Sequence, residues 1–206
     1  MSKKMSIDPI GSALLVMDFQ RVILDRYAVD AEGLLTRTAG LIEAARQAGM
    51  IVVYVVVGFR AGHPEISPLN LTFAAVKKAN LLVLSEADVA IHPAVAPEPG
   101  EVVVTKHRVS AFAGTDLDMI LRANGIEALI LAGITTSGVV LSTVRHAADA
   151  DYRIMVVEDC CSDKDEEAHR VLVESVFPAQ AIVVETDDIA GALFTSFCDT
   201  SDKSYK

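Results

Sequence analysis

The chain contains no tryptophan, and aromatic residues make up only 5% of its 206 residues. Its 51% apolar content consists mainly of Val, Ile, Leu and Ala. These are the residues that strands need when both of their faces are buried under helices. The length suits one substantial core, so we expect a single domain over residues 1–206, with a polar tail at about 199–206.

Several other features are scarce, and each scarcity excludes a class of protein. Three cysteines, Cys160, Cys161 and Cys198, are too few for a disulfide framework, so we expect them to be reduced. A net charge of −10 argues against a nucleic-acid partner. The first apolar run, Ala13 to Met17, is too short for a signal peptide or a membrane span. We therefore expect a cytoplasmic protein with no membrane or nucleic-acid partner.

Apolar runs alternate along the chain with segments of helical periodicity, which indicates an α/β fold with a parallel sheet. The runs predict buried strands at residues 12–17, 51–57, 101–105, 129–131, 153–158 and 181–184. The helical patterns cover residues 31–49, 70–79, 117–124, about 136–149, 165–176 and 187–197.

The stretch Ala128–Thr143, ALILAGITTSGVVLST, joins a strand to a helix. Gly133 frees the backbone there, and Thr136 or Ser137 is expected to cap the helix. Such a junction leaves unpaired N–H groups and a positive dipole end, which suit a developing oxyanion. The first helical turn, however, contains no thiol, imidazole or carboxylate.

Two charged residues stand at predicted strand ends: Asp18 follows the first strand and Lys106 follows the third. Ligands of open parallel sheets bind beyond the carboxyl ends of the strands. If the two strands are neighbours, Asp18 and Lys106 share one crevice. They would then form either a tuned acid–base pair or a plain ion pair, and the sequence leaves both possibilities open.

A long segment, residues 58–100, separates the second and third strands and favours a functional or interface loop. Arg60 and His63 in this segment, together with Arg108, indicate a carboxylate-bearing ligand if the segment folds over the crevice. Exposed loop charges are the alternative interpretation. His63 and His92 lack the tight spacing of zinc ligands, so no metal is expected. Phe112 is either a pocket wall or a core residue.

The chain resembles the isochorismatase-like hydrolases, also called the cysteine hydrolase superfamily. Three motifs in order carry the resemblance: LLVMDFQ, TKHRVSAFAGTDLD and AGITTSGVVLSTVRHA. The resemblance implies a three-layer α/β/α sandwich, Rossmann-like, with a central six-stranded and mainly parallel sheet. It also implies a homo-oligomer, a dimer or tetramer, that acts on a small molecule.

The resemblance also assigns site residues. The family's amidase triad of Asp, Lys and Cys falls on Asp18, Lys106 and Val139, so the thiol position holds a valine. A non-proline cis peptide is implied at Ile134–Thr135, where it directs backbone N–H groups at an oxyanion. The loop residues concerned are Ile134, Thr135, Ser137 and Gly138. The candidate pocket residues are Phe19, Gln20, Arg60, His63, Arg108 and Phe112.

Isochorismatases of this family also lack the thiol, because they cleave a vinyl ether, which requires one well-placed acid. The leading hypothesis is therefore a hydrolase without a cofactor, in which Asp18 is the acid and Lys106 balances its charge. The tyrosine and histidine of family isochorismatases correspond to Thr135 and Ser137 here. One alternative is C–N hydrolysis with a displaced nucleophile, which would be Ser137, Ser142 or Cys161. Another is a non-catalytic relative that binds a metabolite.

Overall fold

The structure is a computed structural model that describes residues 6–85 and 89–201, with side chains in the last helix described up to residue 193. Its centre is a six-stranded sheet in the order β3-β2-β1-β4-β5-β6. All five strand pairs are parallel, so the expected mainly parallel sheet is entirely parallel. The strands are β1 Ser12–Met17, β2 Ile51–Val57, β3 Val102–Lys106, β4 Ala128–Ile134, β5 Arg153–Ser162 and β6 Ile182–Val184.

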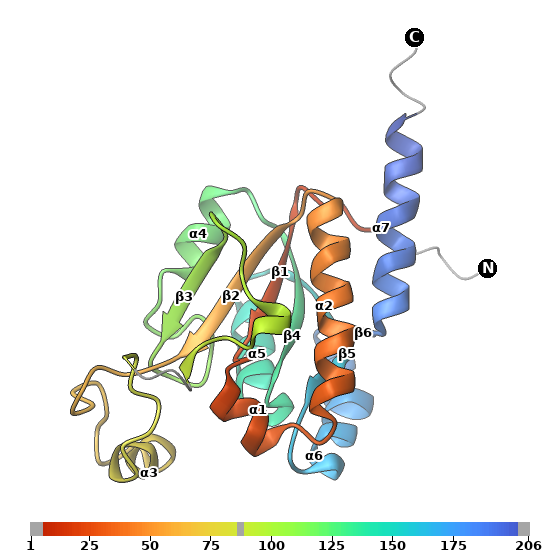
Figure 1. The fold of residues 1–206 in the computed structure, drawn as a ribbon. Coiled ribbons are helices and arrows are strands. Elements are labelled where there is room, and N and C mark those ends of the chain that lie inside the picture. Colours follow the sequence, from red (N-terminus) through yellow and green to blue (C-terminus); the bar gives the residue numbers. More distant parts are fainter. Residues whose placement is uncertain (1–5, 86–88, 202–206) are drawn as a thin grey trace.

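Helices cover both faces of the sheet (Figure 1). They are α1 Arg21–Tyr27, α2 Ala31–Gln47, α3 Leu71–Lys78, α4 Leu117–Ala123, α5 Leu141–Asp149, α6 Glu166–Val171 and α7 Thr186–Ser201. Leucines and isoleucines of α1, α2 and α7 pack with Leu14 and Val16 on one face. Residues of α4 and α5 pack with Leu15 and Met17 on the other. This alternation along β1 confirms the three-layer α/β/α sandwich.

The strand order reverses direction between β1 and β4, because β2 and β3 lie on one side of β1 and β4 to β6 lie on the other. This is the strand order of the doubly wound fold, in which ligands bind where the order reverses, beyond the carboxyl ends of the strands. Asp18 follows β1 and the Thr135 loop follows β4, so both lie at this position.

Several predicted boundaries were wrong. The third strand begins one residue later than expected and includes Lys106. The fifth strand continues past its expected end at charged Glu158, through Asp159 to Ser162. Its register against β4 shifts between Leu131 and Gly133. The predicted helix at 165–176 is α6 followed by a π-helical turn at Leu172–Val176. Helix α7 runs to Ser201, so residues 199–201 of the expected tail are helical, and residues 202–206 lie outside the described residues.

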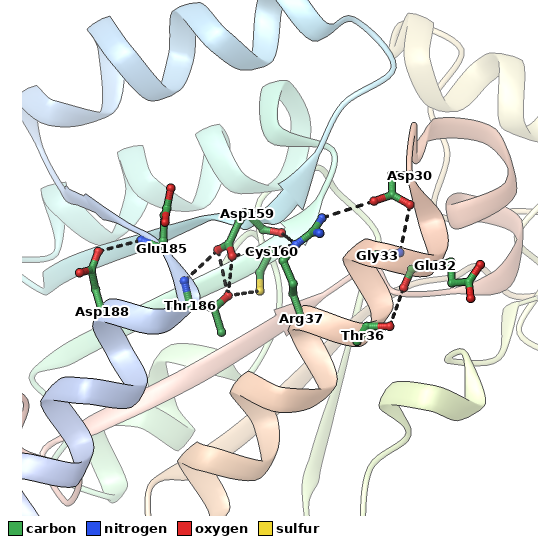
Figure 2. A network of polar contacts seen from close by, with 10 residues as sticks. All are labelled: Asp30, Glu32, Gly33, Thr36, Arg37, Asp159, Cys160, Glu185, Thr186 and Asp188. Atoms are coloured by element: carbon green, nitrogen blue, oxygen red, sulfur yellow. Dashed lines mark hydrogen bonds and ion pairs between the residues drawn. The ribbon is translucent and has the colours of Figure 1, made fainter.

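A polar network joins α2, β5 and the start of α7 (Figure 2). Asp159 lies at its centre: Thr186 donates its backbone N–H to Oδ1 at 3.0 Å and its hydroxyl to Oδ2 at 2.8 Å. Arg37 Nε donates to the Asp159 carbonyl at 2.8 Å. Cys160 Sγ lies 3.3 Å from Thr186 Oγ1. The network therefore fixes the first turn of α7 against the sheet.

Replacing Asp159 by alanine is expected to lower the free energy of unfolding by about 1–3 kcal/mol, because the partly buried donors of Thr186 lose their acceptor. Exposed Asp187, in the same helical turn, provides a control: Asp187→Ala should change the value by no more than about 0.5 kcal/mol. Urea denaturation followed by circular dichroism measures both. Equal stability of the two variants would contradict the role assigned to the network.

Candidate functional site

Asp18 lies immediately after β1, where the backbone leaves the strand. Its φ of 61° is in the left-handed region, which aspartate tolerates better than most residues. Its N–H still donates to Val55 O at 2.8 Å, so the turn is anchored to β2. Gly133 of β4 lies beside this turn, where an added Cβ would come within 3.1 Å of Met17 Cβ. A glycine at this position therefore allows the ends of β1 and β4 to approach closely.

Lys106 and Asp18 form a buried ion pair, with Nζ 2.9 Å from Oδ2 and side chains only 3% and 6% exposed. Their strands are not neighbours, because β2 lies between them. Two strand spacings are about 10 Å, a gap that an extended lysine and an aspartate can bridge together. Lys106 Nζ also donates to Arg108 O at 3.2 Å. The crevice expected from adjacent strands is thus formed across a third strand.

The two oxygens of the Asp18 carboxylate have different environments. Oδ2 is held by Lys106, whereas Oδ1 is buried and has no hydrogen-bond partner among the described residues. Burial raises the pKa of Asp18 above its ordinary value, and the neighbouring Lys106 ammonium opposes that rise. A raised pKa keeps a proton on the carboxyl group at higher pH than usual, which is the property that a general acid requires.

The loop after β4 contains the expected non-proline cis peptide, between Ile134 and Thr135. The predicted side-chain cap is wrong: Thr136–Val140 forms a π-helical turn that leads into α5, with no cap hydrogen bond from a side chain. The Thr136 hydroxyl instead lies 2.8 Å from His169 Nδ1. Ser137 donates both its N–H and its hydroxyl to Asp163 Oδ2, at 2.8 and 2.6 Å.

Two backbone donors of this loop turn back to the cis-peptide residue. The N–H groups of Gly138 and Val140 both donate to Thr135 O, at 3.2 Å. The Val139 side chain is buried in the core beside α5. The loop also meets the segment after β3, since a Cβ on Gly138 would lie 3.9 Å from Val109 Cγ1.

Two of the candidate pocket residues, Phe19 and Gln20, are fully buried. Phe19 packs in the core cluster under α1 and α2. The Gln20 amide donates to the carbonyls of Val57 and Val89, and its oxygen accepts the Val57 N–H at 2.8 Å. Two of these bonds join Gln20 to Val57 at the end of β2, and the third joins it to Val89 in the long segment, so the Gln20 amide is occupied by the protein itself.

The long segment places its two candidates differently. Arg60 is exposed and pairs with Glu65 at 2.6 Å. His63 is 1% exposed and donates from Nε2 to Leu81 O at 2.7 Å, so it is an interior residue of the segment.

The remaining two candidates follow β3. The exposed Arg108 guanidinium donates to the carbonyls of His107 and Glu65, at 2.6 and 3.2 Å, and pairs with no carboxylate in the described chain. Phe112 is buried and stacks on His146, with ring centroids 4.5 Å apart.

A cavity of about 800 Å³ lies beside the cis-peptide loop. Its lining comes from the end of α1, the cis-peptide loop and the segment after β5: Tyr27, Val29, Thr135, Ser137 and residues 163–167. A second cavity, of about 590 Å³, lies at the opposite, amino-terminal edge of the sheet. Asp18 and Lys106 line neither cavity, because both are interior.

No helix among the described residues is both long and apolar enough to cross a membrane. No group of three or more His, Cys, Asp or Glu side chains in that part of the chain is arranged to hold a metal ion. Both Cys160 and Cys161 are free and buried.

Sequence reasoning missed two of the residues that hold the loop, Asp163 and His169, and it expected Thr136 to cap the helix rather than to contact His169. Asp163 lies in the polar stretch DCCSDKDEE, where the only available signal was a carboxylate just beyond a buried strand. The strand was expected to end at residue 158, four residues before its end at Ser162, so Asp163 was not placed near the cis-peptide loop.

The fold and this edge of the sheet together define an α/β protein of the doubly wound type. The family profile described as "Isochorismatase domain" matches residues 12–188, and the chain therefore belongs to the isochorismatase family of hydrolases.

Known proteins agree with this assignment. Maleamate amidohydrolase of Pseudomonas putida is 30% identical over 85% of this chain and 84% of its own length. A Pseudomonas chlororaphis protein named "Probable isochorismatase" is 33% identical over 89% of this chain and 87% of its own. The crystal structure of a cysteine hydrolase from Pseudomonas syringae superposes with a TM-score of 0.86, covering 95% of this chain and 100% of that one. At 22% identity, this last likeness concerns the fold alone.

Proposed function

We propose that the protein hydrolyses a small, carboxylate-bearing metabolite by acid–base catalysis, without a covalent cysteine intermediate. Asp18 is the acid, Lys106 is its counter-charge, and Val139 occupies the position of the family's nucleophilic cysteine. The observation that carries the proposal is the buried Asp18 carboxyl group, with one oxygen held by Lys106 and the other without a partner in the described chain. We also propose that each subunit is a single domain and that the subunits assemble into a homo-oligomer in the cytoplasm.

The reaction that fits these residues is hydrolysis of a vinyl ether. Protonated Asp18 transfers its proton to the terminal carbon of the enol ether, which leaves an oxocarbenium ion. Water adds to this ion and gives up a proton, and the resulting hemiketal collapses to a keto acid and an alcohol. With isochorismate, the keto acid is pyruvate. The proton released by water restores Asp18, so no other reactant is needed.

Lys106 contributes electrostatics to this cycle. Once Asp18 has given up its proton, the buried carboxylate needs a counter-charge, and the Lys106 ammonium lies 2.9 Å away. Arg108 supports recognition of a substrate carboxylate, because its guanidinium contacts only carbonyls in the described chain and keeps its net charge.

A C–N hydrolase is the second candidate, favoured by the likeness to maleamate amidohydrolase. It requires a nucleophile other than Val139. Ser137 donates its hydroxyl to Asp163 Oδ2 at 2.6 Å, and a carboxylate in this position can serve as the base of a serine nucleophile. Burial raises the pKa of Cys160 to about 11 and that of Cys161 further still, so neither is a thiolate near pH 7. Ser137 and Ser142 are therefore the nucleophiles that this second candidate favours.

Alkylation of the cysteines tests whether a thiol takes part in the reaction. We expect pyruvate release from isochorismate to be unchanged after prolonged treatment of the native protein with iodoacetamide at pH 7, because no thiol takes part. Mass spectrometry reports which cysteines carry the label. Loss of activity in step with labelling of Cys161 would contradict the proposal and favour covalent catalysis.

A further inference from the structure

Asp163 connects the segment after β5 to the cis-peptide loop after β4. It follows Ser162, the last residue of β5, and is 7% exposed. Its Oδ2 accepts both the N–H and the hydroxyl of Ser137, at 2.8 and 2.6 Å. Its Oδ1 accepts the Asp165 N–H at 3.2 Å. Both oxygens are therefore occupied, and two of the three bonds fix one residue of the loop.

The neighbouring loop residue is held from the same segment. Thr136 is fully buried, and its hydroxyl lies 2.8 Å from Nδ1 of His169 in α6. Burial lowers the pKa of His169, and nearby Asp163 opposes that shift, so the ring is neutral near pH 7 and Nδ1 can accept the hydroxyl proton. The two residues after Thr135 are thus fixed by a different βα unit of the sheet.

Three backbone donors of the loop are occupied. Ser137 gives its N–H to Asp163, while Gly138 and Val140 give theirs to Thr135 O. Without Asp163, the Ser137 N–H would lose its acceptor, and the π-helical turn would lose its hydrogen bonds to the segment after β5.

We propose that Asp163 is a positioning residue of the active site, which fixes the π-helical turn through its two hydrogen bonds from Ser137. The inference rests on the proposed function, because it assigns the turn to the site that contains Asp18. Asp163 itself does not contact the reacting atoms. It acts through Ser137. Asp163 and Ser137 both line the 800 Å³ cavity.

The test compares Asp163→Ala with a neighbouring control. Asp165→Ala removes the cap of α6, since Asp165 Oδ1 accepts the N–H groups of Glu167 and Ala168, but it leaves the Ser137 bonds in place. Ser137→Ala is the intermediate variant, because it removes the hydroxyl bond and keeps the N–H bond.

Amide hydrogen exchange, followed by NMR, reports on the loop directly. In Asp163→Ala the Ser137 amide should exchange roughly tenfold faster, while amides of Leu14 and Leu15 in β1 keep their rates. Asp165→Ala should leave the Ser137 amide unchanged. An unchanged Ser137 exchange rate in Asp163→Ala would overturn the inference.

Kinetics of pyruvate release from isochorismate tests the connection to the reaction. Asp163→Ala should lower kcat roughly tenfold with little change in KM, and Ser137→Ala should lower it less. An equal loss in Asp165→Ala would reduce Asp163 to a merely structural residue and overturn the positioning role. If the wild type releases no pyruvate, the proposed function fails in its own assay, and the exchange experiment still decides whether Asp163 fixes the turn.

Discussion

Asp18→Asn is expected to lower kcat for pyruvate release from isochorismate by about 10²–10⁴-fold, the range associated with loss of a general acid. The amide cannot deliver a proton, although it matches the carboxyl group in size and can still accept a hydrogen bond from Lys106. Asparagine matches the buried aspartate in shape, so the variant should fold, with lower stability because the Lys106 ammonium loses its counter-charge. Initial rates measure the effect, and thermal melting by circular dichroism verifies the fold.

A matched control for this variant is Asp188→Asn. Asp188 is an exposed carboxylate that accepts the Glu185 N–H at 3.1 Å, far along the chain from the proposed site. Its replacement should leave turnover unchanged. Full activity of Asp18→Asn under the same conditions would remove Asp18 from the mechanism.

Lys106→Met is expected to lower the free energy of unfolding by about 3–5 kcal/mol near neutral pH, because it leaves the Asp18 carboxylate buried without its counter-charge. The loss should shrink at low pH. Without the Lys106 ammonium the pKa of buried Asp18 rises further, and a carboxyl group with a raised folded-state pKa loses its stabilising contribution as pH rises through that value. Urea denaturation at acidic and neutral pH measures the difference.

The double variant Asp18→Asn with Lys106→Met completes this test. With no charge left at Asp18, the methionine should cost much less than it does alone, so the two effects should be strongly non-additive. Additive losses would show that the 2.9 Å contact carries no coupling and would contradict the ion pair on which the mechanism rests.

Strands with a continuous apolar run between polar boundaries were predictable from the sequence. β1 at Ser12–Met17 and β2 at Ile51–Val57 agree with the prediction at both ends. The end of β5 was not predictable, because its final residues include the charged Glu158 and Asp159. Tertiary contacts rather than hydropathy extend the strand. Helix α1 gave little signal, since it has seven residues, no side-chain cap and only Leu24 buried.

Part of the candidate site followed from the sequence in the same way. Asp18 and Lys106 could be placed at the carboxyl ends of their strands, but their pairing was expected only if those strands were neighbours. The structure pairs them across β2 instead. The role of Gln20 could not be predicted from the sequence, because its partners, Val57 and Val89, are 37 and 69 residues away. His63 gave no sign of burial, since its contact with Leu81 depends on how the long segment folds.

The most direct test of the central claim measures two products from one preparation of the wild-type protein: pyruvate from isochorismate and ammonia from maleamate. Hydrolysis by Asp18 without a thiol predicts pyruvate release and no ammonia. Ammonia release that disappears when the cysteines are alkylated, with no pyruvate formed, would contradict the account and identify the protein as a cysteine-dependent amidohydrolase.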